Sequence, residues 1–126
     1  MNDGLTPENR EEIRAFLASA ECVERAVLFG SRATGTFGRA SDIDLALEGN
    51  GLGLTDLLSL RSEFAESSLP YEVDLVIRAE IVDSELERRI EQQGRTFYER
   101  WREPTRCARI ILIFLQTIWR AKRIER

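Results

Sequence analysis

The feature that most constrains the fold is a pair of apolar segments joined by a polar loop, in the stretch LFGSRATGTFGRASDIDLAL from Leu28 to Leu47. The segment 23–29 predicts a strand that ends at Gly30, and the segment 43–48 predicts a second strand. Residues 31–35 leave room only for a short helical turn between them. Because such strands must bury an apolar face, the chain needs helices packed against a sheet.

The rest of the sequence supplies those helices. The predicted order is helix 7–20, strand 23–29, turn 31–35, strand 43–48, helix 56–67, strand 71–77 and helix 84–94. Thr6 and Thr55 are the expected N-caps of the first two helices, and Ser84 with Glu87 forms the pattern of a capping box. Strands that alternate with helices indicate an α/β domain around a small sheet.

Composition excludes several kinds of chemistry. The 126 residues contain no histidine, which removes Ser-His and Cys-His pairs, histidine metal ligands and the usual general base. The two cysteines, Cys22 and Cys107, are too few and too scattered for a disulfide framework or a zinc site. The acidic N-terminus does not have the pattern of a signal peptide, so a cytoplasmic location is expected. Any chemistry must therefore use carboxylates, hydroxyls, backbone amides and a metal.

Charge divides the chain into two parts. Residues 102–126 carry seven basic and two acidic side chains, whereas residues 1–101 carry eleven basic and twenty acidic ones. An acidic body argues against broad nucleic-acid binding. We therefore predict one domain at 1–101 and a basic amphipathic C-terminal helix at 102–126, whose apolar run at 109–119 is too short to span a membrane. The helix is expected to pack on its own domain or in a dimer, and contact with a partner or a membrane surface is the alternative.

Three aspartates interrupt segments that otherwise predict buried strands. Asp42 and Asp44 are two residues apart, so on a strand both carboxylates point to the same side. Asp74 interrupts the third strand in the same way, and the three carboxylates converge if the second and third strands are neighbours. Negative charges that lie this close together repel each other unless a cation lies between them. Mg²⁺ prefers carboxylate and phosphate oxygens as ligands. The alternative interpretation is that Asp42 is a loop or cap residue, Asp44 an exposed strand position and Asp74 a single hydrogen-bonded aspartate.

The turn at Gly30-Ser31 offers the complementary anion site. A glycine after a strand lets the backbone approach a ligand, and the free amides and the hydroxyl of Ser31 are donors for phosphate. Arg32 and Arg39 are predicted to add positive charge to this loop. Phosphates on this turn would lie where metals on Asp42 and Asp44 reach their oxygens.

These motifs resemble those of the nucleotidyltransferase superfamily related to DNA polymerase β. The shared pattern is GSRA, then SDIDL on a strand, then VDLV on a later strand, and the likeness covers about residues 10–100. A chain this short resembles the minimal nucleotidyltransferases, many of which are antitoxins of HEPN-domain toxins. The resemblance implies the nucleotidyltransferase fold, a small mixed sheet flanked by helices. Thr34 departs from the usual GSRARG pattern, which puts one phosphate or partner contact in doubt.

The resemblance also implies roles for the site residues. Gly30 and Ser31 would hold the β and γ phosphates of ATP, Asp42 and Asp44 would bind two Mg²⁺ ions, and Asp74 would be the third carboxylate, as metal ligand or base. The implied reaction is transfer of AMP to a protein hydroxyl, a tyrosine of a cognate HEPN toxin, in a homo- or hetero-oligomer. Two alternatives remain: transfer to a small molecule or an RNA end, and toxin binding without catalysis.

Overall fold

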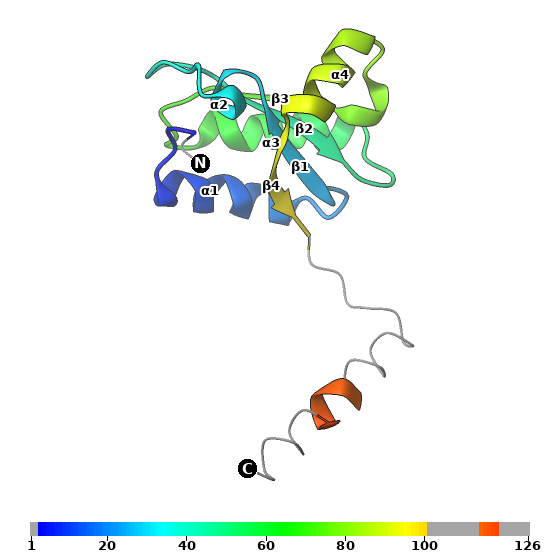
Figure 1. Cartoon of the computed structure of the whole chain (residues 1–126). Helices are drawn as coiled ribbons and strands as arrows, with labels where there is room; N and C mark the ends of the chain where they lie inside the picture. The colour runs from blue at the N-terminus through cyan, green and yellow to red at the C-terminus, as the bar shows by residue number, and fades with distance from the viewer. Residues whose placement is uncertain (1–2, 101–113, 119–126) are drawn as a thin grey trace.

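The computed structural model describes residues 3–100 and 114–118. Its elements in chain order are α1 (Pro7–Ser19), β1 (Arg25–Phe29), α2 (Ser31–Thr34), β2 (Ile43–Glu48), α3 (Leu54–Glu66), β3 (Val73–Ile77), the 3-10 helix η1 (Arg78–Glu80), α4 (Ser84–Gln93) and β4 (Arg95–Glu99). Figure 1 shows this arrangement, in which strands alternate with helices. The predicted α/β class is confirmed.

The strands form one mixed sheet in the order β3-β2-β1-β4. β2 runs parallel to β3, whereas β1 is antiparallel to both β2 and β4. The second and third strands are therefore neighbours, as the convergence of the aspartates required. In this register Asp44 lies opposite Phe29 on one side and opposite Asp74 on the other.

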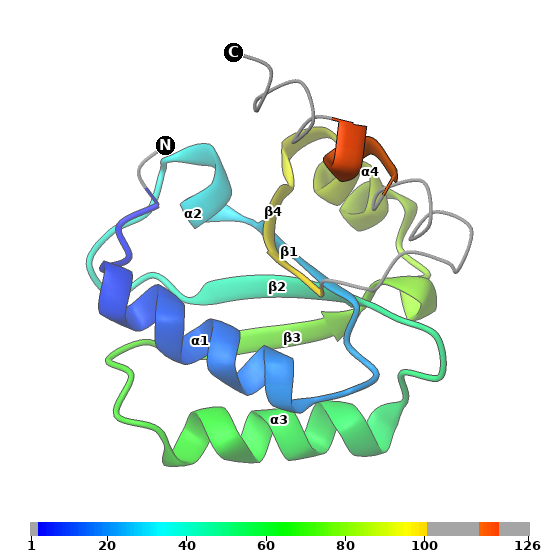
Figure 2. The same ribbon diagram turned by 90° about the horizontal axis from the view of Figure 1, so that it is seen from below.

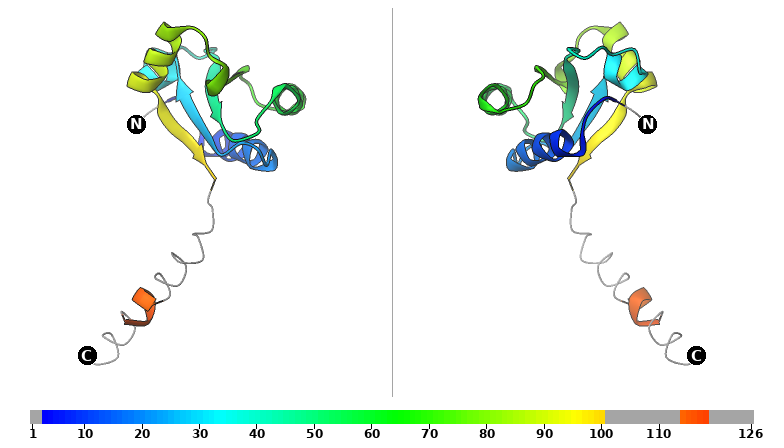
Figure 3. Two further views of the ribbon diagram at one scale, coloured as in Figure 1. Left: turned by 90° about the vertical axis from the view of Figure 1, so that its right-hand side faces the viewer. Right: turned by 90° about the vertical axis from the view of Figure 1, so that its left-hand side faces the viewer.

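The two faces of the sheet carry different helices. α1 and α3 cover one face, where they enclose the main core with the inward side chains of three strands, β1, β2 and β3, namely Leu28, Ile43, Leu45 and Leu75. α4 packs on the opposite face, where Ile90 contacts the smaller cluster of Val27 and Ala46. Figures 2 and 3 show the sheet between these layers, with α2 at the end of the sheet on the side of α4. Because side chains alternate along β2, Asp44 shares the α4 face with Ala46.

The helix starts agree with the sequence in part. Thr6 caps α1 by accepting a hydrogen bond from the Asn9 amide at 3.1 Å, as predicted. Thr55 is not a cap, because α3 begins at Leu54, two residues earlier than predicted, and the Asp56 carboxylate accepts from the amide of Gly53, the actual N-cap. Likewise the cap of α4 is Asp83 and not Ser84.

The predicted partner of Ser84 is engaged elsewhere. The Glu87 carboxylate accepts a hydrogen bond of 3.0 Å from the Arg78 guanidinium, so the capping box does not form. The end of the same helix agrees with the sequence, since the Gly94 amide donates to the Ile90 carbonyl at 2.8 Å.

The fourth strand was not predicted. β4 has the sequence RTFYE, in which only Phe97 is buried. A five-residue segment directly after a helix, without a clear alternation of apolar and polar residues, gives little sequence signal of a strand. It pairs with β1 with an irregularity between Ala26 and Val27. The strands β1 and β3 are each two residues shorter than predicted at their starts.

The predicted C-terminal helix lies largely outside the described residues. Residues 114–118 are helical, with Phe114 and Leu115 exposed. The predicted boundary between residues 101 and 102 stays a prediction. No helix within the described ranges is long and apolar enough to cross a membrane.

Candidate active site

The three predicted carboxylates lie together at one end of two neighbouring strands. Asp44 is the second residue of β2, Asp74 is the second residue of β3, and their Cα atoms are partners in the parallel ladder. Asp42 immediately precedes β2, so it stands at the end of the strand and not inside it. Asp42 and Asp74 are exposed and Asp44 is half-buried. The sequence-based convergence of these three side chains is present in the fold.

The Gly30-Ser31 turn contacts this group of carboxylates directly. Gly30 directly follows β1 and is the N-cap of α2, with φ 76° and ψ −155°. A Cβ atom added to Gly30 would collide with Oδ2 of Asp44 and lie 3.2 Å from its Cγ. Glycine is therefore required here both for the backbone conformation and for the space that the Asp44 carboxylate occupies. The turn and the carboxylates form a single site.

Electrostatics at the site are unbalanced. Burial raises the pKa of the Asp44 carboxyl above its usual value, and the negative charges of Asp74 and then Asp42 raise this pKa further. Within residues 3–100 and 114–118, no hydrogen bond or ion pair reaches the side chain of any of the three. Three acidic side chains without a protein cation provide a place where a bound cation would be stabilised.

The site is not a closed cage for a metal. No group of three or more His, Cys, Asp or Glu side chains in the described part of the chain is arranged to hold an ion by itself. The donors that are present, carboxylate oxygens beside a turn of backbone amides, are nevertheless those that Mg²⁺ uses when a substrate phosphate completes its coordination. The residues fit a metal that arrives with a nucleotide.

Arg32 has a different place from the one predicted. Its side chain is 1% exposed, and the guanidinium donates to the Ser41 carbonyl from Nε at 3.1 Å and from one terminal nitrogen at 2.9 Å. The other terminal nitrogen donates to the Asp3 carbonyl at 2.8 Å. The guanidinium also lies over the rings of Phe37 and Tyr71, at 5.2 and 4.4 Å from their centroids. The donors of Arg32 therefore face interior carbonyls, and the prediction that Arg32 adds positive charge to the loop stays a prediction.

The buried position gives Arg32 a positioning role. Ser41 directly precedes Asp42, so the two hydrogen bonds to its carbonyl fix the end of the loop that presents the first carboxylate. The sequence signal for such a role was weak, because an arginine beside a Gly-Ser turn equally suits phosphate contact.

The remaining predicted loop residues are accessible. Arg39 is exposed and lines a hollow of about 580 Å³ together with Phe37 and Tyr71. Ser31 is half-buried at the first position of α2. Thr34, which stands where related motifs have arginine, places its hydroxyl 3.0 Å from that of Thr36. The phosphate contacts of Ser31 and Arg39 stay predictions.

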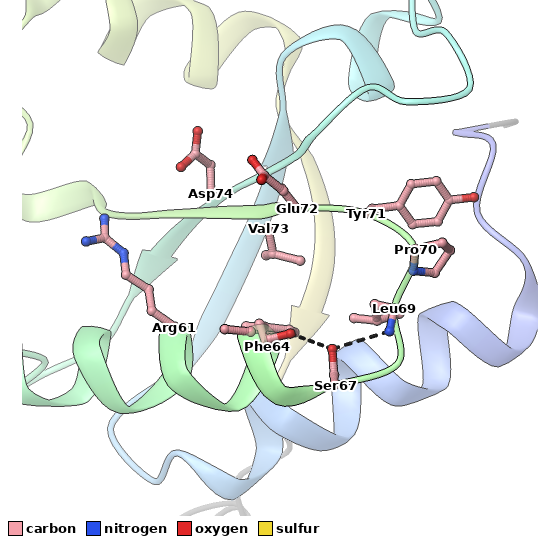
Figure 4. A pocket seen from close by; sticks show the side chains of 10 residues that line it. Arg61, Phe64, Ser67, Leu69, Pro70, Tyr71, Glu72, Val73 and Asp74 are labelled. Carbon is pink, nitrogen blue, oxygen red and sulfur yellow. Dashed lines mark hydrogen bonds between the residues drawn. The ribbon is translucent and has the colours of Figure 1, made fainter.

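A groove lies beside the outer edge of β3, on the side of Asp74 away from β2. Figure 4 shows it between the C-terminal half of α3 and the start of β3, with Asp74 at one end. Its volume is about 630 Å³. Phe64, Leu69 and Tyr71 contribute apolar walls, and Arg61 and Glu72 contribute charge. This groove had no counterpart in the sequence-based predictions, because its two walls come from segments that only the fold brings together.

Comparisons with known proteins agree with this geometry. The family model described as polymerase beta, nucleotidyltransferase matches residues 11–103. No curated protein matches the chain.

Three solved structures share the fold. A chain of a toxin-antitoxin crystal structure with AMP-PNP is 24% identical with a TM-score of 0.61, and covers 94% of this chain and 92% of that chain. A chain of the complex between a tri-AMPylated Shewanella oneidensis HEPN toxin and MNT antitoxin is 21% identical with a TM-score of 0.56. The match covers 94% of this chain and 90% of that chain. A chain of the toxin-antitoxin MntA-HepT is 21% identical with a TM-score of 0.56, and covers 96% and 92%.

Proposed function

The chain belongs to the polymerase beta nucleotidyltransferase family, and from that membership we propose that it transfers AMP from ATP to a tyrosine hydroxyl of a HEPN-domain toxin, as the antitoxin of that toxin. The observation that carries the proposal is the group of carboxylates packed against the Gly30-Ser31 turn. A nucleotidyltransferase must hold a polyphosphate and neutralise its charge at one place. The turn provides the first function and the carboxylates, through a metal, provide the second.

The turn is suited to the β and γ phosphates of ATP. The first backbone N–H groups of α2 and the hydroxyl of Ser31 directly follow Gly30, whose Cα lies against Asp44. Donors of this kind hold phosphate oxygens through short hydrogen bonds. Arg39 is exposed in the following loop and can add positive charge to the phosphates. The leaving group of the reaction, pyrophosphate, would therefore lie on the β1 side of the site.

Mg²⁺ would be held by Asp42 and Asp44, with Asp74 as a third ligand. When bound, it supplies positive charge to the phosphate oxygens and lowers the cost of the negative charge that develops during transfer. The raised pKa of Asp44 in the free protein means that its charged form is penalised by burial and by its acidic neighbours. A cation would remove that penalty, so nucleotide and metal are expected to bind together.

Activation of the acceptor hydroxyl is assigned to Asp74. The chain has no histidine, and of the three site aspartates Asp74 is the one farthest from the Gly30-Ser31 turn across the sheet. Asp74 accepts the proton of the tyrosine hydroxyl, whose pKa of about 10 is well below that of an aliphatic alcohol. The tyrosine oxygen then bonds to the α-phosphorus of ATP, the bond from that phosphorus to the bridging oxygen breaks, and pyrophosphate leaves.

The solved structures support a toxin as the acceptor. Chains of similar fold occur in a toxin-antitoxin complex with AMP-PNP and in a complex of a tri-AMPylated HEPN toxin with MNT antitoxin. The described part of this chain forms a single sheet with its helices, without a further unit to hold a small acceptor. An added AMP would place negative charge and bulk on the toxin, which explains neutralisation if the toxin must admit an anionic substrate.

Intact-mass analysis tests the proposal. The proposed partner, a HEPN-domain toxin encoded by the adjacent gene, is incubated with the protein, ATP and Mg²⁺, and a gain of one or more AMP masses is expected. Asp44→Asn should abolish the gain, while Glu66→Gln, which alters an exposed carboxylate on α3 on the other side of the sheet, should not. If the toxin is neutralised equally by Asp44→Asn and never gains mass, the protein is a binding antitoxin without catalysis.

A further inference from the structure

We propose that the groove between α3 and β3 is the acceptor site, and that it takes a polypeptide segment that carries the acceptor hydroxyl. This inference rests on the AMP transfer proposed above. It assigns a binding surface to residues that lie outside the nucleotidyltransferase motifs.

The order of the strands gives the direction from which the acceptor arrives. The Gly30-Ser31 turn lies at the end of β1, Asp44 lies on the adjacent β2, and Asp74 lies on β3 at the edge of the sheet. In an in-line displacement the attacking oxygen approaches the phosphorus opposite the leaving group. With pyrophosphate on the β1 side, the hydroxyl must come from the β3 side. The groove opens there, with Asp74 at its end.

The walls of the groove suit a peptide side chain. Its volume of about 630 Å³ lies within the range of about 300–1,000 Å³ typical of ligand sites. Phe64, Leu69, Pro70 and Tyr71 provide apolar and aromatic surface. Figure 4 shows Phe64 and Leu69 on the α3 side of β3, whereas the Asp74 carboxylate points to the other side of the strand at the end of the groove. Apolar walls of this kind stabilise the apolar side chains of a segment laid along the edge of β3, beside the residue whose hydroxyl reaches Asp74.

The edge of β3 adds groups that recognise a main chain. The Glu72 carbonyl faces β2, where it accepts from the Ile43 amide at 2.9 Å. Because orientations alternate along a strand, Val73 and Leu75 direct their N–H and C=O groups outward. The Leu75 carbonyl confirms this direction, since it accepts from the Arg61 guanidinium at 3.2 Å. No other described strand pairs with this edge, so the outward groups of Val73 are available to a peptide backbone.

Charge favours a polypeptide over RNA at this surface. The ionisable lining consists of Arg61 against Glu72 and Asp74, a net negative charge. RNA binding depends on basic groups that neutralise phosphates, and the one arginine of the lining already donates to a carbonyl.

Two tryptophan variants on α3 test the acceptor site. Ala65→Trp places a bulky ring in the groove from an exposed helix position, whereas Ser62→Trp adds the same ring on an exposed part of α3 outside it. Transfer of label from α-³²P-ATP to the proposed HEPN-domain toxin gives the KM for the toxin. Calorimetry with Mg²⁺ and AMP-PNP gives nucleotide affinity without an acceptor.

Ala65→Trp should raise the KM for the toxin at least about tenfold, as expected for loss of a central contact, with unchanged AMP-PNP affinity. Ser62→Trp should leave both values within about twofold of wild type. Equal KM values for Ala65→Trp and wild type, or equal increases of KM in both tryptophan variants, would overturn the assignment of the groove as the acceptor site. If label is transferred to RNA and Ala65→Trp blocks that transfer, the acceptor is RNA and the assignment of a polypeptide acceptor is overturned. If wild-type protein binds AMP-PNP but modifies no acceptor, the proposed function fails, and the acceptor site with it.

Discussion

Replacement of Gly30 by alanine tests whether the turn and the carboxylates form one site. Gly30 has φ 76° and ψ −155°, a region of backbone space used almost only by glycine. A Cβ atom at this position would also collide with the Asp44 carboxylate. The variant should therefore lose stability through strain in the backbone and through displacement of Asp44.

Gly35 provides the matched control for the backbone contribution. It also has positive φ, 83° with ψ 9°, but nothing lies within 4 Å of an added Cβ atom. Gly35→Ala should cost about 1 kcal/mol of unfolding free energy, the penalty of the left-handed conformation. Gly30→Ala should cost about 3 kcal/mol, since its conformation is less accessible and the carboxylate must move. In a domain of this size each kcal/mol lowers Tm by roughly 4–8 °C.

Urea unfolding without metal measures these free energies, and calorimetry with Mg²⁺ and AMP-PNP measures the site. A double-mutant cycle with Asp44→Ala isolates the contact, because the carboxylate is then absent and the cost of Gly30→Ala should fall by about 1–2 kcal/mol. Gly30→Ala should weaken AMP-PNP binding, whereas Gly35→Ala should not. The reasoning is refuted if Gly30→Ala costs no more than Gly35→Ala, or if its cost is the same with and without the Asp44 carboxylate.

Four further outcomes are expected. Because the folded-state pKa of Asp44 is raised, the metal-free free energy of unfolding should fall as pH rises from the unfolded pKa near 4 through the folded value. Asp44→Asn lacks this fall. Urea unfolding should therefore show Asp44→Asn more stable than wild type at about pH 7 and equally stable near pH 3. Asp74→Asn should lower kcat far more than ATP affinity, and Ser31→Ala should do the reverse; equal losses of affinity with unchanged kcat would contradict these roles. Arg32→Lys should lower the unfolding free energy by about 1–3 kcal/mol and accelerate amide exchange in the loop before Asp42, because an ammonium cannot replace the planar donors; wild-type exchange would contradict the positioning role. Deletion of residues 104–126 should change self-association, measured by sedimentation, and leave AMP-PNP binding intact; a folded truncation that no longer binds AMP-PNP would count against a separate tail.

Local sequence signals were sufficient for the elements whose cause is local. The cap at Thr6, the stop at Gly94 and the second strand all depend on residues within one turn or one strand. The spacing of Asp42 and Asp44 and the glycine before Ser31 likewise have meaning along the chain itself. These features predicted the site because a strand of period two and a turn at glycine follow from backbone geometry alone.

Contacts between distant segments decided the rest. The pairing of Asp44 with Asp74 depends on β2 and β3 being neighbours, and the groove needs α3 to pack below the edge of β3. Arg32 shows the same limit, since it stands beside the Gly30-Ser31 turn and yet faces the carbonyls of Asp3 and Ser41. The direction of a long side chain follows from which carbonyls and rings surround it, and only the tertiary fold brings them there.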